Sequence, residues 1–397
     1  MKVLVVNAGS SSLKYQLIDM DNESVLAKGN CDRIGTTGCI SHKAKGESYK
    51  KDIDMPSHSV AFEVVVDALT KGELKVIDSM DEISAVGHRV VHGGQIFKSS
   101  TVITDEVIKQ IEELSVLAPL HNPAAVLGIK ACINIMGADI PQVAVFDTSF
   151  HSTLPDYAYM YSVPYEYYEK YGVRKYGFHG TSHKYVSNRC AEVMGKSIDE
   201  LKIVTCHLGN GCSISAVENG KCVDTTMGFT PVDGMMMGTR TGSVDPSVIT
   251  FIGEKENLSY EDINNICNKK SGLLGISGLS NDSRDVCDAA DRGEHRSLLA
   301  KNMQHYQVLK YIGSYIAAMG GVDAIVFTGG LGENNPGLRS KICDKLSFLG
   351  ITCDEEVNDS YGKEVRISTP DSKVAVYVIP TDEEMVIARD TVALTSK

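Results

Sequence analysis

Hydrophobic and polar positions follow one plan near the start of the chain. Val3–Val6 is an uninterrupted aliphatic run, Asn7–Ser12 is polar and small, and Leu13, Tyr15 and Leu17 then alternate with polar neighbours. An apolar run, a short polar turn and an alternating run predict a strand, a tight turn and a second strand.

The predicted turn carries groups that suit an anion. Gly9 lets the backbone approach a ligand closely, and three serines, Ser10, Ser11 and Ser12, offer hydroxyl and N–H donors. Lys14 adds a cation just beyond the turn. The same residues also suit an ordinary hairpin with a serine-rich turn, and this stretch by itself leaves both interpretations open.

The same plan recurs about 200 residues later. Ile203–Val217 reads IVTCHLGNGCSISAV, an apolar strand, a turn at Gly209–Gly211 and a second alternating strand. Two such units suggest a duplicated domain with two phosphate-facing turns across a cleft.

Other elements alternate between strand and helix patterns. Strands are expected at 83–91, 142–146 and 323–328, and helices at 60–69, 105–117, 123–136, 246–252, 260–268, 297–319, 336–346 and 382–392. Asn122 is the expected cap of the helix that begins at Pro123. Asp147 follows a short strand directly, and ligands bind at the carboxyl ends of strands in α/β sheets.

Length and charge limit the classes of protein. At 397 residues the chain predicts two domains, with a boundary near residue 150, and the formal charge of −12 argues against nucleic acid or an acidic membrane as partner. Tyr157–Tyr176 carries eight of the 17 tyrosines, which fits either a dimer contact or a packed connector.

Targeting and cysteine patterns point to a cytoplasmic protein. No signal-peptide pattern follows Met1, and glycines interrupt the most apolar late run, Tyr311–Phe327. The eleven cysteines form no C-x-x-C pair, so we expect free thiols.

Two arginines and one histidine stand in glycine-rich surroundings. Arg240 lies in GTRTG within the long segment Thr226–Pro246, Arg89 precedes HGG, and His179 lies in GFHGTSH. Arginine suits a fork contact with carboxylate or phosphate. Each residue alone also has a structural interpretation, as a surface ion pair or a buried histidine.

Two familiar motifs are excluded, and one strand–turn–helix unit remains. Gly195-Lys196-Ser197 lacks the first glycine of a phosphate-binding P-loop because Cys190 stands there, and HRVVH at 88–92 lacks the glutamate of a zinc-protease helix. The strand ending at Thr328 runs into Gly329–Gly332, a pattern typical of a nucleotide platform.

Taken together, these motifs resemble the acetate kinase family over essentially the whole chain. The resemblance rests on motifs in one order: NAGSSSLKY (7–15), GHRVVHGG (87–94), APLHNP (118–123), FDTSFH (146–151), YGFHGTSH (176–183), HLGNGCS (207–213), MMMGTRTGSVDP (235–246) and TGGLGEN (328–334).

The resemblance implies an α/β fold of two duplicated ribonuclease-H-like (actin-like ATPase) domains. Each is expected to be a mixed sheet flanked by helices, with the active-site cleft between them. The expected domains are 1–149 plus 385–397, for acetate, and 150–384, for the nucleotide. The implied reaction is ATP + acetate to acetyl phosphate + ADP and its reverse, by direct in-line transfer in a cytoplasmic homodimer.

The resemblance also assigns roles to residues. Arg89, Asp147, His179 and Arg240 are expected to be catalytic, with Arg89 also binding acetate and with Val91, Leu120, Phe178 and Pro231 around its methyl group. Asn7 and Glu383 would bind Mg²⁺, with Mn²⁺ able to substitute. The expected ATP contacts are Ser10, Ser12, Lys14, His207, Leu208, Gly209, Asn210, Gly211, Asp282, Ser283, Arg284, Gly330, Leu331, Gly332, Glu333 and Asn334.

Two residues carry hypotheses of their own. Acetate is already ionised at neutral pH and needs no base, so we expect Asp147 to orient Arg89 or the metal shell rather than to move a proton. Ser283 stands where many relatives carry an apolar or aromatic residue, which predicts thinner packing on the adenine and tolerance of other nucleotides.

Two alternatives stay open at this point. One is a propionate or butyrate kinase. The other is an actin-like or heat-shock-like switch that hydrolyses ATP slowly, which has no reason to carry Arg89, Phe178 and Arg240 around an apolar notch.

Overall fold

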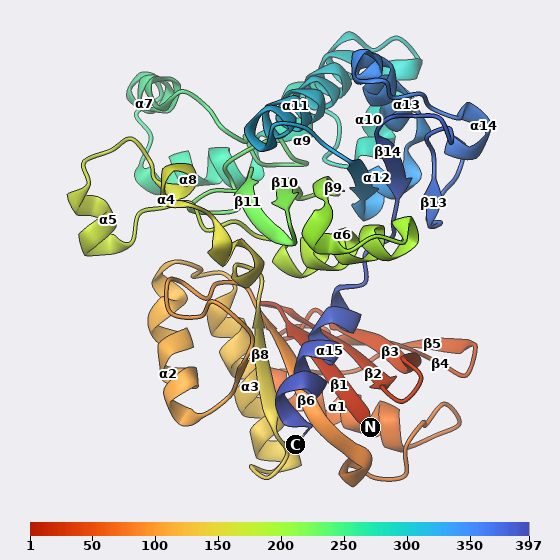
Figure 1. The fold of residues 1–397 in the computed structure, drawn as a ribbon. Helices are drawn as coiled ribbons and strands as arrows, with labels where there is room; N and C mark the ends of the chain where they lie inside the picture. The colour runs from red at the N-terminus through yellow and green to blue at the C-terminus, as the bar shows by residue number, and fades with distance from the viewer. Residues whose placement is uncertain (397) are drawn as a thin grey trace. The chain divides into compact units, whose positions relative to one another are not determined.

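The computed structural model describes residues 1–396, which form two compact units. One unit joins Met1–Ser149 with the C-terminal segment from Asp382, and the other is Phe150–Thr381. The segment from Asp382 to Glu384 is therefore grouped with the first unit, whereas the sequence predicted a boundary at 385. The first unit is drawn in red to yellow with the last helix in blue (Figure 1).

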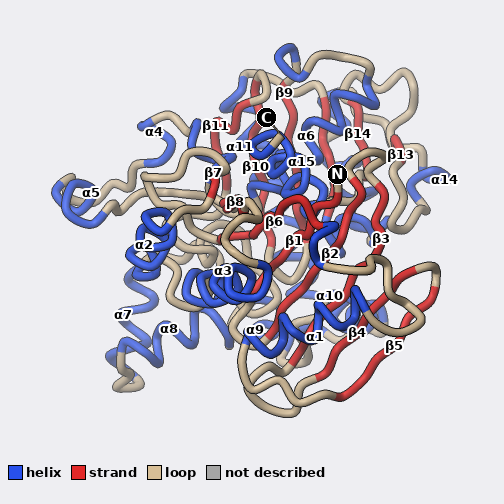
Figure 2. The backbone as a smooth tube through the Cα atoms, turned by 90° about the horizontal axis from the view of Figure 1, so that it is seen from below, coloured by secondary structure: helices blue, strands red, loops and turns tan. Residues whose placement is uncertain are grey.

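The first unit contains a mixed sheet in the order β5-β4-β3-β2-β1-β6-β8-β7. Figure 2 shows these strands side by side. They are β1 (Lys2–Ala8), β2 (Ser12–Asp19), β3 (Ser24–Asp32), β4 (Cys39–Ala44), β5 (Glu47–Asp52), β6 (Ile83–Val90), β7 (Thr101–Val102) and β8 (Gln142–Phe146).

Helices cover both faces of this sheet. Phe62 of α1 and Cys132 of α3 pack on one face with Leu4 and Leu13, and Ile387 of α15 packs on the other face with Val3. The helices are α1 (His58–Thr70), α2 (Asp105–Glu113), α3 (Asn122–Met136) and α15 (Glu383–Thr395), with short 3₁₀ turns η1 (Met80–Glu82) and η2 (Leu114–Val116).

The second unit contains a mixed sheet in the order β11-β10-β9-β12-β14-β13. Helix α6 packs on one face through Val186 and Cys190, and α11 packs against β9 and β10. The strands are β9 (Lys202–Leu208), β10 (Cys212–Glu218), β11 (Lys221–Thr225), β12 (Ala324–Thr328), β13 (Val365–Arg366) and β14 (Ala375–Val378).

The helices of the second unit cover its sheet and its loops. They are α4 (Asp156–Tyr159), α5 (Glu166–Tyr171), α6 (Gly180–Met194), α7 (Pro246–Lys255), α8 (Tyr260–Lys269), α9 (Gly272–Ser277), α10 (Ser283–Asp291), α11 (His295–Met319), α12 (Gly329–Asn334), α13 (Pro336–Lys345) and α14 (Glu355–Asn358), with 3₁₀ turns η3 (Ser149–Thr153), η4 (Ile198–Glu200) and η5 (Ser347–Leu349).

The predicted repeat is confirmed. In each unit an antiparallel hairpin, β1–β2 or β9–β10, lies beside a parallel strand, β6 or β12. Asn7 faces Lys14 across the first hairpin, and Leu208 faces Cys212 across the second. The two sheets therefore repeat one topology although their residues differ.

Two local predictions are wrong. Asn122 does not cap α3, because its amide is buried and bonds the backbone of His92 on both sides, at 3.1 Å to the N–H and 3.0 Å to the carbonyl oxygen. Gly329–Gly332 is not a turn, because α12 begins directly after β12. Gly329 has φ +76°, and a Cβ there would lie 2.7 Å from the Leu208 carbonyl oxygen, so only glycine fits this sharp entry.

The long segment Thr226–Pro246 is held by buried side chains and by backbone hydrogen bonds. Met235, Met236 and Met237 are buried, and the Met237 N–H donates to the Arg240 carbonyl oxygen at 3.1 Å. All eleven cysteines lie in the described part of the chain, and all are free thiols. Within residues 1–396, none of the helices combines the length and apolar character needed to cross a membrane.

Candidate active site

Three predicted site residues lie where the parallel strands of the first unit end. Asn7 is near the end of β1, Arg89 is near the end of β6, and Asp147 directly follows β8. These strands are neighbours, and the Asp147 N–H continues the ladder by donating to the Val90 carbonyl oxygen at 3.0 Å. The fold therefore collects at one edge three residues that are up to 140 positions apart in the sequence.

Arg89 and Asp147 form a buried fork. Arg89 donates from Nε to Oδ1 at 2.9 Å and from Nη2 to Oδ2 at 2.6 Å. The Asp147 side chain is 2% exposed and that of Arg89 is 25% exposed. Burial raises the pKa of Asp147, and the Arg89 cation partly offsets this effect. The Asp147 charge in turn raises the pKa of Arg89, which stays a cation with one edge open to solvent.

Glu383 and Glu384 begin α15, which packs against β1, β6 and β8. Both carboxylates raise the pKa of Arg89, after the larger effect of Asp147, so they lie within its electrostatic reach. Burial is the first cause that raises the pKa of Glu384. The end of the sheet therefore carries acidic oxygens as well as a cation.

In the second unit, the loop after β9 and the start of α12 line a cavity of about 560 Å³. The volume is within the range of small-molecule sites. Glycine backbone and amide side chains from Asn281, Asn334 and Asn335 give it a polar wall. Its lining residues are Gly209, Asn210, Leu273, Asn281, Asp282, Ser283, Arg284, Gly330, Leu331, Asn334 and Asn335.

His179 and Arg240 converge on one point of this loop. A Cβ placed on Gly211 would lie 3.5 Å from His179 Nε2 and 3.6 Å from Arg240 Nη1. Arg240 Nη1 also donates to the Pro231 carbonyl oxygen at 3.2 Å, and burial lowers the Arg240 pKa. Two nitrogen donors therefore stand beside a glycine that leaves room for an anion.

The backbone at His179 is strained. His179 precedes α6 as its N-cap with φ +56°, a left-handed conformation that few non-glycine residues adopt. Such conformations cost about 1–3 kcal/mol and gather at functional sites. The strain is consistent with a functional role for the direction in which the His179 side chain points.

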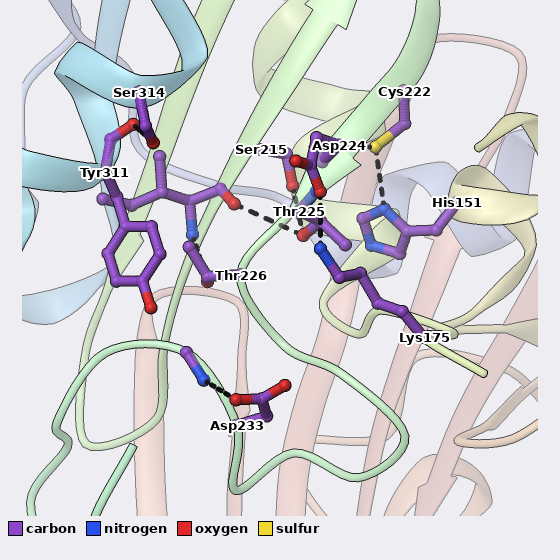
Figure 3. A network of polar contacts seen from close by, with 12 residues as sticks. His151, Lys175, Ser215, Cys222, Asp224, Thr225, Thr226, Asp233, Tyr311 and Ser314 are labelled. Carbon is purple, nitrogen blue, oxygen red and sulfur yellow. Dashed lines mark hydrogen bonds and ion pairs between the residues drawn. The ribbon is translucent and has the colours of Figure 1, made fainter. Parts of the chain in front are cut away.

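A layer of buried polar side chains supports His179 from beneath. The buried Ser182 and His183 of α6 meet the buried Thr205 of β9 and Ser213 of β10, with the partly buried His207 of β9 beside them, where an apolar interface would be usual. A second polar network, shown in Figure 3, lies farther along β10 and β11 and includes the ion pair of Lys175 Nζ with Asp224 at 2.6 Å. His151 Nδ1 lies 3.1 Å from Cys222 Sγ there, and burial lowers the His151 pKa to about 4.

Other predicted site residues have mixed surroundings. Glu333 does not line the cavity, because its carboxylate accepts hydrogen bonds from the Gly329 N–H at 2.8 Å and from Thr328 Oγ1 at 3.3 Å. His207 stacks on His179, with ring centroids 4.2 Å apart. Neither His207, Leu208, Gly211 nor Gly332 is among the lining residues of the cavity.

The residues expected around a methyl group divide between the units. Val91 and Leu120 belong to the first unit and Phe178 and Pro231 to the second. Leu120 is exposed, Phe178 is buried, and the Phe178 carbonyl oxygen lies 2.8 Å from His151 Nε2. In the first unit, Ser10, Ser12 and Lys14 lie on the β1–β2 hairpin, where the Gly9 N–H donates to the Ser12 carbonyl oxygen at 2.8 Å.

The sequence interpretation missed several residues of the site. Ser213, His183 and Thr205 form the polar layer, and Leu273, Asn281 and Asn335 line the cavity. Thr205 and His207 on β9 and Ser213 and Ser215 on β10 alternate at positions where a core-facing strand is usually apolar. That pattern was the available signal for the polar layer.

Both the sequence and the fold are similar to those of known proteins. An acetate kinase from Thermoanaerobacterium thermosaccharolyticum is 60% identical over 393 residues, 98% of each chain. A crystal structure of Porphyromonas gingivalis acetate kinase matches with a TM-score of 0.96 at 49% identity, covering 99% of both chains. A propionate kinase from Francisella tularensis matches with a TM-score of 0.92 at 42% identity, again over 99% of both chains.

These matches agree with the duplicated α/β units. The class is that of phosphotransferases with a carboxyl group as acceptor, built on duplicated actin-like ATPase domains. A sequence model of the acetokinase family matches residues 2–389, and the chain belongs to that family.

Proposed function

We propose that this protein transfers the γ-phosphoryl group of ATP to acetate, giving acetyl phosphate and ADP, and catalyses the reverse reaction. The main support is the convergence of His179 Nε2 and Arg240 Nη1 on Gly211, beside a cavity of nucleotide size. Membership of the acetokinase family gives the acceptor and the donor.

The nucleotide occupies the second unit in this proposal. Its phosphates approach the loop Gly209–Gly211 and the residues Gly330 and Leu331 of α12, because Gly209, Gly330 and Leu331 line the cavity. Its base and ribose lie toward Asp282–Arg284. Ser10, Ser12 and Lys14 of the first hairpin complete the phosphate contacts.

Acetate is held through Arg89. The guanidinium already holds Asp147 in a fork, so its direction is fixed before the substrate arrives. An acetate oxygen attacks the γ-phosphorus, and the bond to the β–γ bridging oxygen breaks with its electron pair leaving on ADP. Arg89, His179 and Arg240 balance the charge on the equatorial oxygens during this step.

No proton transfer is needed in this scheme. Acetate is ionised near neutral pH, and ADP leaves as an anion. Asp147 is already bonded through both oxygens to Arg89. We assign it the role of orienting that arginine.

Magnesium fits the donor set at the end of the first sheet. Asn7 and Glu383 supply hard oxygen donors, and Mg²⁺ in such sites uses one or two protein ligands with substrate phosphates and water. The described residues include no group of three or more His, Cys, Asp or Glu arranged to hold a metal. Asn7 and Glu383 would hold Mg²⁺, which would neutralise phosphate charge during the transfer.

The test of the function is trapping of acyl phosphate with hydroxylamine. Purified protein is given MgATP with acetate, propionate, butyrate or no acid, and hydroxamate and ADP are both measured. We expect both products to require an acid and acetate to be the best one. A preference for propionate or butyrate would change the substrate, and ADP release indifferent to acid would favour the ATPase switch.

We also propose that the protein is a homodimer. Tyr157, Tyr165 and Tyr171 are strongly exposed on α4, α5 and the segment between them. Aromatic side chains exposed in this way are typical of protein interfaces. Sedimentation equilibrium checks the mass, and a monomer at micromolar concentration would contradict the proposal.

A further inference from the structure

A chain of hydrogen bonds runs from His179 into the interior of the second unit. His179 Nδ1 lies 2.8 Å from Ser213 Oγ, and the same oxygen lies 2.7 Å from His183 Nε2. His183 Nδ1 lies 2.7 Å from Thr205 Oγ1. We call His179, Ser213, His183 and Thr205 the Ser213 relay.

The three inner members of the relay are fully buried. Ser213, His183 and Thr205 each have 0% exposure. Burial lowers the pKa of His183 well below its usual value, so this ring is neutral and carries one proton. With one proton on each hydroxyl and on the His183 ring, the direction of donation at one end of the relay fixes it at the other.

The outer end sets that direction in the proposed function, because a nitrogen that faces a phosphoryl group must carry a proton to stabilise its charge. His179 Nε2 therefore donates, and His179 Nδ1 accepts from Ser213 Oγ. Ser213 Oγ then accepts from His183 Nε2, and His183 Nδ1 accepts from Thr205 Oγ1 at 2.7 Å, a shorter contact than the 3.5 Å from Thr205 Oγ1 to the Ser215 carbonyl oxygen. The relay therefore leaves the proton of a neutral His179 on Nε2 and turns that nitrogen toward Gly211.

Resting on the proposed function, we propose that Ser213 and His183 are positioning residues for phosphoryl transfer, which fix the ring direction and tautomer of His179. A histidine with a strained backbone and a free-turning ring would present Nε2 to the phosphoryl group only part of the time. The relay supplies the orientation in advance, as supporting side chains do in other preorganised sites.

Charged and titratable groups surround His179 on several elements. His207 of β9 stacks on the ring, Arg240 Nη1 approaches the same point at Gly211, and His151 lies behind His183 with ring centroids 5.7 Å apart.

The central variant is Ser213→Ala, with Ser215→Ala as matched control. Ser215 lies two residues along β10, is equally buried, and pairs its hydroxyl with Thr225 Oγ1 of β11 at 2.8 Å (Figure 3). We expect Ser213→Ala to lower kcat about tenfold or more with KM values changed less than about twofold. Ser215→Ala should lose a similar amount of thermal stability but keep the kcat and the pH profile of the parent.

A double-variant cycle separates positioning from general damage. His179→Asn tolerates the positive φ but cannot reach Gly211, and it is combined with Ser213→Ala. If Ser213 acts through His179, adding Ser213→Ala to His179→Asn changes kcat by less than about twofold. Multiplied losses in the double variant, or equal kcat losses in the two serine variants, would overturn the proposal.

A measurement that does not depend on enzyme activity tests the relay separately from the proposed function. In ¹⁵N-histidine-labelled protein, the imidazole signals of His179, assigned with His179→Asn, should show a proton on Nε2 and none on Nδ1, and should change in Ser213→Ala but not in Ser215→Ala. Unchanged His179 signals in Ser213→Ala would overturn the relay. Absence of acetate-dependent hydroxamate with the parent protein would instead overturn the proposed function.

Discussion

At the scale of single residues, the Arg89–Asp147 pair decides how the acceptor site is built. Two hydrogen bonds of 2.9 and 2.6 Å hold a cation in place with only part of its edge exposed. Removal of one partner from such a buried pair is costly because the other charge stays buried. The pair therefore orients Arg89, and loss of either side chain is expected to destabilise the folded protein.

Asp147→Asn tests this orientation. The amide keeps one acceptor for Arg89 and loses the charge, so we expect kcat to fall about a hundredfold while the pH optimum stays unchanged. Steady-state kinetics from pH 5.5 to 9 measure both effects. Glu364→Gln is the control, because Glu364 accepts a similar fork from Arg189 at 2.7 and 2.8 Å far from these residues in the chain. Loss of the acidic limb in Asp147→Asn would show that the carboxyl group moves a proton.

Ser283 is the second residue for which a single substitution gives a testable prediction, here on nucleotide preference. It lines the cavity of the second unit beside Asp282 and Arg284, and its short side chain gives a base little surface for stacking. We expect the protein to use GTP and other nucleoside triphosphates as well as ATP. Ser283→Phe should lower the KM for ATP about tenfold, because stacking of a base on an aromatic ring contributes about 1–3 kcal/mol. A nucleotide panel measures this preference, and strict use of ATP by the parent protein would contradict the prediction.

At the scale of elements, the turn between β9 and β10 needs a glycine at position 211, with space beside it. A methyl group on Gly211 would contact His179 Cε1 at 3.4 Å and Arg240 Nη1 at 3.6 Å without a clash. The fold should therefore accept alanine, while the space left for the phosphoryl group shrinks.

Gly211→Ala is accordingly expected to keep its melting temperature within a few degrees and to lose about a hundredfold or more in kcat/KM. The control is Gly313→Ala within α11, where a Cβ meets nothing within 4 Å, and that change should stabilise the helix by about 1 kcal/mol. Calorimetry and kinetics on both variants provide the check. Full activity in Gly211→Ala would mean that no anion approaches this glycine.

At the scale of the whole molecule, buried histidines link stability to pH. The histidines whose pKa burial lowers to about 4 are His88, His92, His151 and His305. Their unfolded pKa is near 6.5, so the unfolded chain binds more protons between these values. Stability is therefore complete above pH 6.5 and is lost as pH falls toward 4, by up to about 3 kcal/mol per residue.

His88→Gln should reduce the pH dependence of stability by the contribution of one buried histidine. His88 Nε2 pairs with Gln142 Oε1 at 2.6 Å, and glutamine does not titrate. Urea unfolding at pH 7 and pH 5 measures the difference, and the exposed His295, changed to Gln, is the control. Equal pH dependence in the parent and His88→Gln would contradict the assignment.

The elements were predicted far better than the contacts between them. The alternation of Leu13, Tyr15 and Leu17 was enough to place a strand, because burial of one face repeats every two residues. The amide of Asn122 was misassigned as a cap, because its partner His92 lies 30 residues away in the sequence. The sequence predicts a turn at the glycines after β12, because only the closeness of Leu208 in the structure shows why the helix starts there.

The sequence alone determined the class of protein, the duplicated hairpins and the identity of the charged groups. These depend on local periodicity, on glycine and on motif order, which the chain carries in consecutive residues. Only the tertiary structure decided that Asp147 bonds Arg89, that Glu333 serves α12, and that Ser213 connects His179 to His183. Hydrogen bonds depend on distances of about 3 Å between side chains remote in sequence, and the packing of strands and helices sets those distances.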